Sequence, residues 1–330
     1  MKAIVYTKVG SPDVLQILEI NKPIPKANQV LICVKASAIS NMEYMRFGTQ
    51  ISGGKPPLFA RIINIGLNAT GKALGADVAG IVEEVGKNIT SVKKGDEVFG
   101  MTTGFIGGWA EYAVLDEKSL YLKPKSLSFE EAGAMPTGGI TALGAVKAAK
   151  IKTGQEVLIH GASGGVGHYV VQIAKVFGAT VTGICSTRNL DVVRSIGADN
   201  VIDYKTEDFS KKGKLYDAII VVNGYNPLKK YNKLLKKDGK CVFVGGMKQT
   251  MMGSLGSPLY SIFSGKKFAP VAFPFMPVKK SLTELKTLAD DGKIKPFIDK
   301  VYSAYDIGDA LRYVIETHPQ GKVAIDMNFK

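Results

Sequence analysis

The sequence predicts an α/β protein in which a strand-rich first part is followed by a doubly wound parallel sheet. Three observations carry this prediction. Short β-favouring runs separated by glycine turns fill about the first 125 residues, apolar strands and helices then alternate, and a glycine-rich segment joins one of those strands directly to a helix. Apolar strands alternating with helices are typical of a parallel sheet that is buried on both faces. With 330 residues and roughly 150 residues per domain, two domains are expected.

The first part reads as five strands connected by turns. Its β-favouring runs are bounded by Gly, Pro or Lys-Gly-Asp, which predicts strands at Ala3–Tyr6, Val30–Ala36, Val78–Val85, Glu97–Gly100 and Glu111–Val114. Residues 49–73 are irregular and rich in Gly, Asn and Lys. A loop of this length is often functional, as a lid or an entrance, and its role stays open.

The second part begins with a helix signal. Ser128 followed by Glu131 is a capping-box pattern, which predicts a helix that starts after Ser128. Strands are then predicted at Glu156–His160, Thr180–Cys185, Val201–Ile202, Ala218–Val222 and Cys241–Val244, with helices at Val166–Phe177, Leu190–Ile196 and Leu228–Leu235. The last elements are a helix at Ser281–Asp290 and strands near Val301 and at Val323–Asp326.

The composition says more about the cellular compartment of the protein than about its binding partner. A net charge of +14 favours anionic partners, such as nucleic acid, an acidic membrane or a phosphorylated cofactor, without choosing among them. The three cysteines, Cys33, Cys185 and Cys241, are far apart and lie in apolar runs, which predicts buried strand residues and no disulfide framework. Neither a secretory signal nor an apolar run of about 18 residues is present, so a cytoplasmic protein is expected.

The glycine-rich segment predicts a dinucleotide site. It follows the strand EVLIH and opens the helix HYVVQIAKVFG, which is the context that a dinucleotide fingerprint requires. Its glycines allow a tight turn, a close approach of the backbone to a pyrophosphate, and packing of the helix on the strand. The predicted cofactor-binding residues in this segment are Gly161, Ser163, Gly164, Gly165, Val166 and Gly167.

The end of the next strand predicts which dinucleotide binds. NAD enzymes usually have an acid there, but this strand ends in Ser186, Thr187 and Arg188. Hydroxyls and a guanidinium would bind a 2′-phosphate that a carboxylate would repel, so NADP(H) is favoured. The alternative is that Arg188 only covers the following helix. Tyr204, after the third strand, either flanks the same phosphate or the adenine, or packs ordinarily.

Over nearly its whole length the chain resembles the medium-chain dehydrogenase/reductase superfamily, in its zinc-free quinone oxidoreductase (zeta-crystallin-like) branch. The resemblance lies in MKAIVYTKVGSPDVLQ, LGADVAGIVEEVG, KKGDEVFG, GGWAEYAV, GAMPTGGITAL, GASGGVGHYVVQIAK, IGADNVIDY and GKVAIDM. It implies a GroES-like, partly open β-barrel as catalytic domain, formed by residues 1–125 and completed by 274–330. It also implies an inserted Rossmann NADP-binding domain at 126–273, an active site in the cleft between them, and a homodimer.

The resemblance also frames the zinc question. Zinc-dependent members have Cys and His-Glu ligands where this chain reads Ser40-Asn41-Met42-Glu43, Gly75-Ala76-Asp77 and Met135-Pro136-Thr137. Zinc prefers three or four ligands of N or S type, and only Asp77 and Glu43 remain as candidates. His160, His168 and His318 are scattered, which favours structural roles. We therefore expect no metal.

Without a Lewis acid, the substrate must be activated by conjugation, as quinones and α,β-unsaturated carbonyls are. Such a substrate accepts a hydride at carbon while charge moves to its oxygen, and the protein positions the reactants and donates hydrogen bonds. Ser40 stands where the family has Asn, with Asn41 beside it and Glu43 in place of Asp. Ser40, Asn41 or Tyr44 could donate to the substrate oxygen, and Thr141 matches a threonine near the nicotinamide amide.

Further candidates lie near the ends of later strands. Asn223 follows the fourth strand of the second part, and Gly245 and Gly246 follow the fifth, at the edge where open α/β sheets bind ligands. Lys322 resembles a tail residue that approaches the cofactor, although a Gly-Lys turn explains it equally well. Trp109 either contacts the substrate or packs in the core.

Three functions compete. The first is an NADPH-dependent reductase of quinones, enones or enals, and the second is a zinc-free NADP-dependent alcohol or carbonyl reductase. The third is a basic protein that binds RNA or an anionic membrane on the same fold. The lysines occur in pairs interleaved with apolar positions, and no stacking-aromatic motif of an RNA module appears, which argues against nucleic acid and leaves a peripheral membrane contact open.

Overall fold

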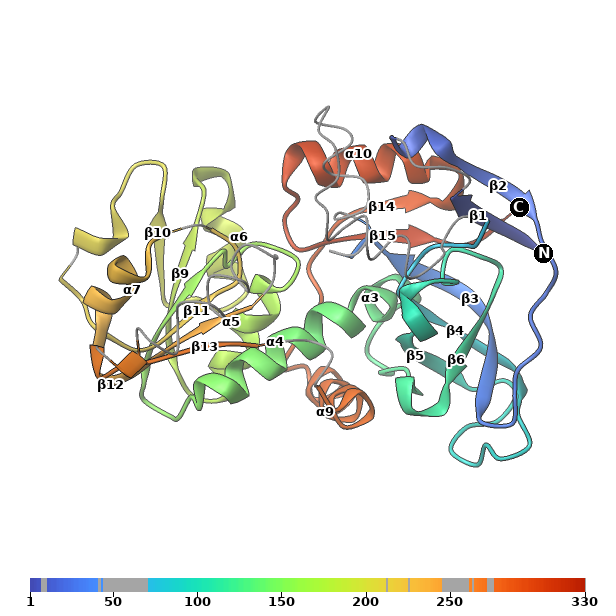
Figure 1. The fold of residues 1–330 in the computed structure, drawn as a ribbon, viewed down its shortest axis with the longest axis horizontal. Helices are drawn as coiled ribbons and strands as arrows, with labels where there is room; N and C mark the ends of the chain where they lie inside the picture. The colour runs from blue at the N-terminus through green and yellow to red at the C-terminus, as the bar shows by residue number, and fades with distance from the viewer. Residues whose placement is uncertain are drawn as a thin grey trace. The chain divides into compact units, whose positions relative to one another are not determined.

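The computed structural model describes residues 1–6, 11–40, 43, 71–211, 213–224, 226–244, 261–262, 264–271 and 276–329. The chain forms two compact units. One contains Met1–Thr137 and Val278–Lys330, and the other contains Gly138–Pro277 (Figure 1). The assignment of a catalytic and an NADP-binding domain, with its boundaries at 125 and 274, stays a prediction.

The second unit is built on a six-stranded, fully parallel sheet. Its spatial order is β10 (Asn200–Asp203), β9 (Thr180–Cys185), β8 (Glu156–His160), β11 (Tyr216–Val221), β12 (Leu235–Phe243) and β13 (Lys267–Pro270). The helices that alternate with these strands are α5 (Gly167–Val176), α6 (Leu190–Ser195) and α7 (Leu228–Leu234) (Figure 1). The prediction of a doubly wound parallel sheet is therefore confirmed.

The strand order reverses at β8. The chain proceeds from β8 to β9 and β10 on one side, then crosses to β11 on the other side. In an open α/β sheet, ligands bind at the carboxyl ends of the strands beside such a switch point. The residues that follow His160, Cys185 and Val221 therefore lie at the edge where a ligand is expected.

Strand β12 is longer than the sequence predicts. The predicted strand covered Cys241–Val244, whereas the structure begins it at Leu235. Its first half contains Lys236, Lys237 and Asp238, so it lacks the apolar pattern of a buried strand. Asp238 has a φ of 63°, and the pairing of β11 with β12 shifts register between Tyr216 and Ala218, which accommodates this irregular stretch.

The first unit contains a seven-stranded mixed sheet and a separate pair of strands. The pair is β1 (Lys2–Tyr6) with β2 (Leu15–Glu19). The sheet is formed by β14 (Ile298–Ser303), β15 (Lys322–Asp326), β3 (Gln29–Ala38), β4 (Asp77–Val85), β5 (Glu97–Met101) and β7 (Leu120–Leu122), with β6 (Tyr112–Asp116) also paired to β3.

Strand β3 organises this sheet. It pairs with β4 along one edge, and along the other edge it pairs first with β6 and then, at its end, with β15. The C-terminal strand β15 thereby lies beside the end of β3, next to Ile39 and Ser40. Helices α3 (Phe129–Ala134), α9 (Val278–Asp290) and α10 (Ile307–Thr317) belong to the same unit, and both Ser128 and Glu131 make the predicted capping-box hydrogen bonds.

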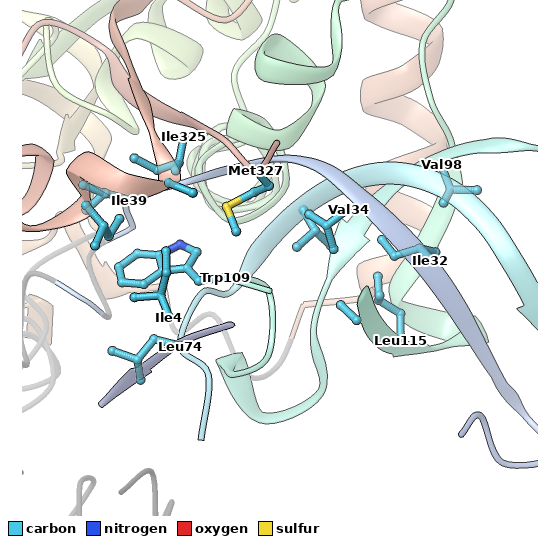
Figure 2. Packing of buried hydrophobic residues seen from close by; sticks show 14 of the residues in the cluster. Ile4, Ile32, Val34, Ile39, Leu74, Val98, Trp109, Leu115, Ile325 and Met327 are labelled. Carbon is cyan, nitrogen blue, oxygen red and sulfur yellow. The ribbon is translucent and has the colours of Figure 1, made fainter. Parts of the chain in front are cut away.

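The core of the first unit surrounds Trp109, which is fully buried. Figure 2 shows its indole among Ile4, Ile39, Leu74 and Met327, which come from distant parts of the sequence. The packing interpretation of Trp109 is thus the one that the structure supports. Among the described residues, no helix has the length and apolar character needed to cross a membrane.

Candidate functional site

The glycine turn of the second unit connects β8 to α5 and requires glycine at two of its positions. Gly161 has a φ of +87°, and a Cβ there would lie 2.8 Å from the backbone nitrogen of Asn223. A Cβ on Gly167 would overlap the carbonyl oxygen of Gly161. These contacts explain why glycine occupies both positions, and they place Asn223, which follows the neighbouring strand β11, directly against the turn.

The turn exposes hydrogen-bond donors at the start of α5. In the described part of the chain, the backbone N–H groups of Gly165, Val166 and Gly167 donate to no other group. Unpaired N–H groups at a helix N-terminus, together with the helix dipole, favour an anion such as a diphosphate. The donors that a dinucleotide needs are therefore present at the predicted position.

Helix α4 (Pro136–Ala149) approaches the same turn. A Cβ on Gly138 would lie 2.8 Å from the carbonyl oxygen of Gly165 and 3.0 Å from the ring of Tyr169. Thr141, which is partly exposed, lies one helical turn further along α4. The structure thus brings the helix that carries Thr141 close to the glycine turn, as a contact with a bound dinucleotide would require.

Ser163 is buried in the turn, and a residue that sequence reasoning missed holds it there. The amide of Asn189 donates to Ser163 Oγ at 2.8 Å, and the backbone N–H of Asn189 donates to the carbonyl oxygen of Ser186 at 2.8 Å. Asn189 is itself only 6% exposed. It therefore links the glycine turn to the turn that follows β9.

The turn after β9 presents the predicted 2′-phosphate residues. Ser186 precedes a short 3-10 helix, Thr187–Asn189, in which Thr187 and Arg188 are exposed. Tyr204 follows the neighbouring strand β10 and is 49% exposed. These side chains lie at the carboxyl ends of neighbouring strands, where a ligand is expected.

In the first unit, Asp77, Thr137 and Lys322 form a buried polar cluster. Asp77 is fully buried at the start of β4, and its carboxylate accepts the Thr137 hydroxyl at 2.5 Å and the Thr137 backbone N–H at 2.9 Å. The Lys322 ammonium, from β15, lies 3.5 Å from Asp77 Oδ2 and donates to the carbonyl oxygen of Ile39 at 3.0 Å. Burial raises the pKa of Asp77, and Lys322 and Thr137 oppose that shift.

Lys322 was predicted to approach the cofactor. Its side chain is 5% exposed, and two of its three N–H donors are directed at groups of its own unit. Its position at the start of β15, directly after Gly321 with a φ of 65°, is also that of a Gly-Lys turn. A contact between Lys322 and the cofactor stays a prediction.

Ser40 and Glu43 form a second buried pair close to this cluster. The Ser40 hydroxyl lies 2.5 Å from Glu43 Oε2, and the Ser40 backbone N–H donates to the same oxygen at 2.9 Å. Both side chains are at least nine-tenths buried. Burial raises the pKa of Glu43, and the negative charge of Asp77 adds to that shift. The protonated form of Glu43 is therefore favoured relative to a carboxyl in water.

The oxygens of these pairs are already engaged with other groups of the chain. Across the described residues, no three His, Cys, Asp or Glu side chains gather in a way that could hold a metal ion. The Asp77 carboxylate already accepts two hydrogen bonds from Thr137, and the Lys322 ammonium lies 3.5 Å from its Oδ2. Zinc prefers thiolate or imidazole ligands, and the described cluster supplies neither.

The histidines and cysteines occupy structural positions. His160 is buried at the end of β8, where its Nδ1 is 2.9 Å from the Tyr231 hydroxyl, and burial lowers its pKa to about 4. His168 begins α5, and its Nδ1 is 3.0 Å from the carbonyl oxygen of Gly164. The cysteines lie in strands as free thiols, two buried and Cys33 partly exposed.

Several predicted site residues lie outside the described residues. They are Asn41, Tyr44, Gly245 and Gly246, together with most of the loop at 49–73. Sequence reasoning missed Asn189, Asp203 and Thr137. Only Asp203 had a recognisable signal, because it ends a strand beside the expected ligand edge.

Comparisons with known proteins agree with this architecture. The "Alcohol dehydrogenase GroES-like domain" family matches residues 26–125, and the "Zinc-binding dehydrogenase" family matches residues 196–325. A chloroplast envelope quinone oxidoreductase homolog of Arabidopsis thaliana is 31% identical, covering 99% of this chain and 98% of the relative. An NADPH-dependent alkenal/one oxidoreductase of the same species is 32% identical, covering 98% of this chain and 79% of the relative.

Solved structures lead to the same conclusion. The quinone oxidoreductase from Coxiella burnetii superposes with a TM-score of 0.85 at 28% identity and covers 99% of both chains. This similarity confirms the GroES-like plus Rossmann fold class. The fold, the glycine turn and the matched relatives together show that this chain is an oxidoreductase that belongs to the medium-chain dehydrogenase/reductase superfamily, in its zinc-free quinone oxidoreductase branch.

Proposed function

We propose that this protein uses NADPH to transfer a hydride to quinones or α,β-unsaturated carbonyls, without zinc. The observation that carries the cofactor choice is the turn after β9, whose residues Ser186, Thr187 and Arg188 include a guanidinium and no carboxylate. The names of the two Arabidopsis relatives support the substrate class, since one is a quinone oxidoreductase homolog and the other an alkenal/one oxidoreductase.

The chain's own groups would bind the cofactor, orient the substrate and supply the substrate oxygen with hydrogen bonds and a proton. NADPH, when bound, supplies the hydride, which adds to the conjugated carbon while negative charge develops on the substrate oxygen. The N–H groups of Gly165, Val166 and Gly167 would bind the diphosphate. The oxygen of the reduced substrate then needs a hydrogen-bond donor and finally a proton.

Ser40 could be that donor only if its hydroxyl hydrogen is released from Glu43. When Glu43 is ionised, Ser40 donates to it and has no second hydrogen to offer. When Glu43 is protonated, it can itself donate to Ser40 Oγ, and the Ser40 hydrogen can turn toward a substrate. Burial raises the pKa of Glu43 and so favours this second arrangement.

Zinc independence is proposed from the donor set. One matched family carries zinc in its description, yet Asp77 and Glu43 are the only candidate ligands at the corresponding positions here. The Asp77 carboxylate is hydrogen-bonded to Thr137 and paired with the Lys322 ammonium, and an oxygen of Glu43 is hydrogen-bonded to Ser40. A conjugated substrate fits such a site because its reduction needs no Lewis acid.

Three further features belong to this proposal. A homodimer would extend the parallel sheet beyond β13, the last strand on that side among the described residues. The free thiols are compatible with a reducing, cytoplasmic location. The +14 charge is compatible with peripheral contact with an anionic membrane.

The cofactor choice is tested by replacing Arg188. Wild-type protein should bind NADPH much more tightly than NADH, and Arg188→Ala should remove most of that preference, by about tenfold or more, because a charge-assisted contact to the 2′-phosphate is lost. Arg194→Ala, which removes an exposed arginine of the following helix, is the matched control. An unchanged NADPH/NADH ratio of dissociation constants in Arg188→Ala would contradict the assignment.

A further inference from the structure

A single carboxylate connects the two turns that face the proposed 2′-phosphate site. Asp203 is the last residue of β10 and is 5% exposed. Its Oδ2 accepts the hydroxyl of Thr187 at 2.6 Å, and its Oδ1 accepts the backbone N–H of Lys205 at 2.9 Å. Thr187 belongs to the turn after β9, and Lys205 belongs to the turn after β10.

Strand register explains why these groups meet. Strands β9 and β10 are parallel neighbours, and Asp203 pairs with Cys185, the last residue of β9. Thr187 is two residues beyond Cys185, so it lies within reach of the Asp203 side chain. The backbone N–H of Tyr204 also donates to the carbonyl oxygen of Cys185, at 3.1 Å, which fixes the start of the second turn.

The hydroxyl of Thr187 is already committed to Asp203. The Thr187 hydrogen bond is the main reason why the pKa of Asp203 lies below its ordinary value, so the carboxylate is ionised and can only accept. A threonine hydroxyl has one hydrogen, and here that hydrogen points to Asp203. Thr187 therefore cannot donate to a phosphate while this contact is intact.

We propose that Asp203 is a positioning residue for the 2′-phosphate of NADPH, which acts by fixing the Thr187 and Lys205 turns to each other. The inference rests on the proposed use of NADPH. In this arrangement Thr187 acts through Asp203 and is not a phosphate ligand. Arg188 is presented from one turn, and Tyr204 and Lys205 are presented from the other.

The first turn is anchored at both of its ends. Asn189 links it to Ser163 in the glycine turn, and Thr187 links it to Asp203. On the second turn, the ammonium of Lys205 lies 5.5 Å from the centre of the Tyr204 ring. Arg188 itself is exposed, so the backbone on which it stands is what the two anchors fix.

A competing interpretation makes the opposite prediction. If Asp203 acted only through its negative charge, it would repel a phosphate dianion, and its removal would strengthen binding of the 2′-phosphate. If Asp203 positions the turns, its removal weakens that binding. The sign of the effect therefore separates the two interpretations.

The experiment measures binding of 2′,5′-ADP and of ADP by calorimetry to the full chain, in wild type, Asp203→Ala, Thr187→Val and the double variant. These ligands report on the 2′-phosphate without any turnover. We expect wild type to prefer 2′,5′-ADP, each single variant to lose about tenfold of that preference, and the double variant to lose no more than either single variant. Thr187→Ser, which keeps the hydroxyl, should retain the preference.

The ADP measurement separates positioning from general damage, because a merely structural effect would weaken both ligands equally. If Asp203→Ala does not fold, Thr187→Val at its exposed position carries the same test. A stronger preference in Asp203→Ala, or fully additive losses in the double variant, would overturn the inference. A wild-type protein without any 2′,5′-ADP preference would overturn the NADPH proposal as well, whereas unchanged preferences in the variants would overturn only the role of Asp203.

Discussion

Lys322 and Asp77 form an ion pair from which water is excluded, since their side chains are 5% and 0% exposed. At the residue scale, such a pair contributes little to net stability, but breaking it is costly because one charge stays buried without its partner. The Thr137 hydrogen bonds reduce this cost without removing it.

Lys322→Met should therefore destabilise the protein by about 3 kcal/mol, measured as the free energy of unfolding in urea. The double variant Asp77→Asn/Lys322→Met, which removes both charges, should recover most of that loss. A double variant no more stable than Lys322→Met would show that the ion pair is not the cause.

His160 predicts how stability depends on pH. Burial lowers its pKa from 6.5 to about 4, with the Lys230 charge adding to the shift. Below pH 6.5 the His160 imidazole binds a proton in the unfolded chain but stays neutral in the folded chain. The free energy of unfolding therefore falls as the pH drops from 6.5 toward 4, by up to about 3 kcal/mol. His160→Gln should flatten this dependence, which urea unfolding at pH 7 and pH 4.5 would measure.

At the scale of the element, the junction of β8 and α5 combines structural demands on glycine with those of the proposed dinucleotide site. Gly167 is required by the fold, since a Cβ there would overlap the Gly161 carbonyl oxygen. Gly164 is different, because within the described part of the chain its Cβ would meet only that same oxygen within 4 Å, at 3.7 Å. The protein itself therefore leaves room for a side chain at Gly164.

Gly167→Ala should lower both the melting temperature and NADPH affinity, because the turn must shift. Gly164→Ala should leave the melting temperature unchanged yet weaken NADPH about tenfold or more, since its methyl group would occupy space that the diphosphate needs. Thermal unfolding and NADPH fluorescence titration of both variants check this. Unchanged NADPH affinity in Gly164→Ala would place the diphosphate elsewhere.

The same element shows what the sequence can and cannot predict. The apolar runs at Glu156–His160 and Thr180–Cys185 were predicted with their observed bounds, because a strand buried on both faces has little room for polar residues. The polar first half of β12 was not predicted. Contacts that depend on strand register, such as Thr187 with Asp203, leave no local pattern in the sequence.

At the scale of the whole molecule, the sequence predicts local motifs better than it predicts contacts between residues that are distant in the chain. Lys322 and Asp77 are distant in sequence and meet because β15 pairs with the end of β3, which also pairs with β4. The position of the glycine turn between β8 and α5 could be predicted, because it depends on a local strand–turn–helix pattern. The buried polar pairs could not be predicted, because they depend on which strands pair in the sheet.

The proposed function is the reduction of a conjugated acceptor by this molecule with NADPH and without a metal. The most direct measurement follows NADPH oxidation with 3-penten-2-one and with 2-pentanone, its saturated counterpart, after dialysis against a chelator and with the chelator present. We expect turnover of the enone to 2-pentanone and no turnover of 2-pentanone itself. Turnover of the saturated ketone alone, or loss of enone reduction that added zinc restores, would contradict it.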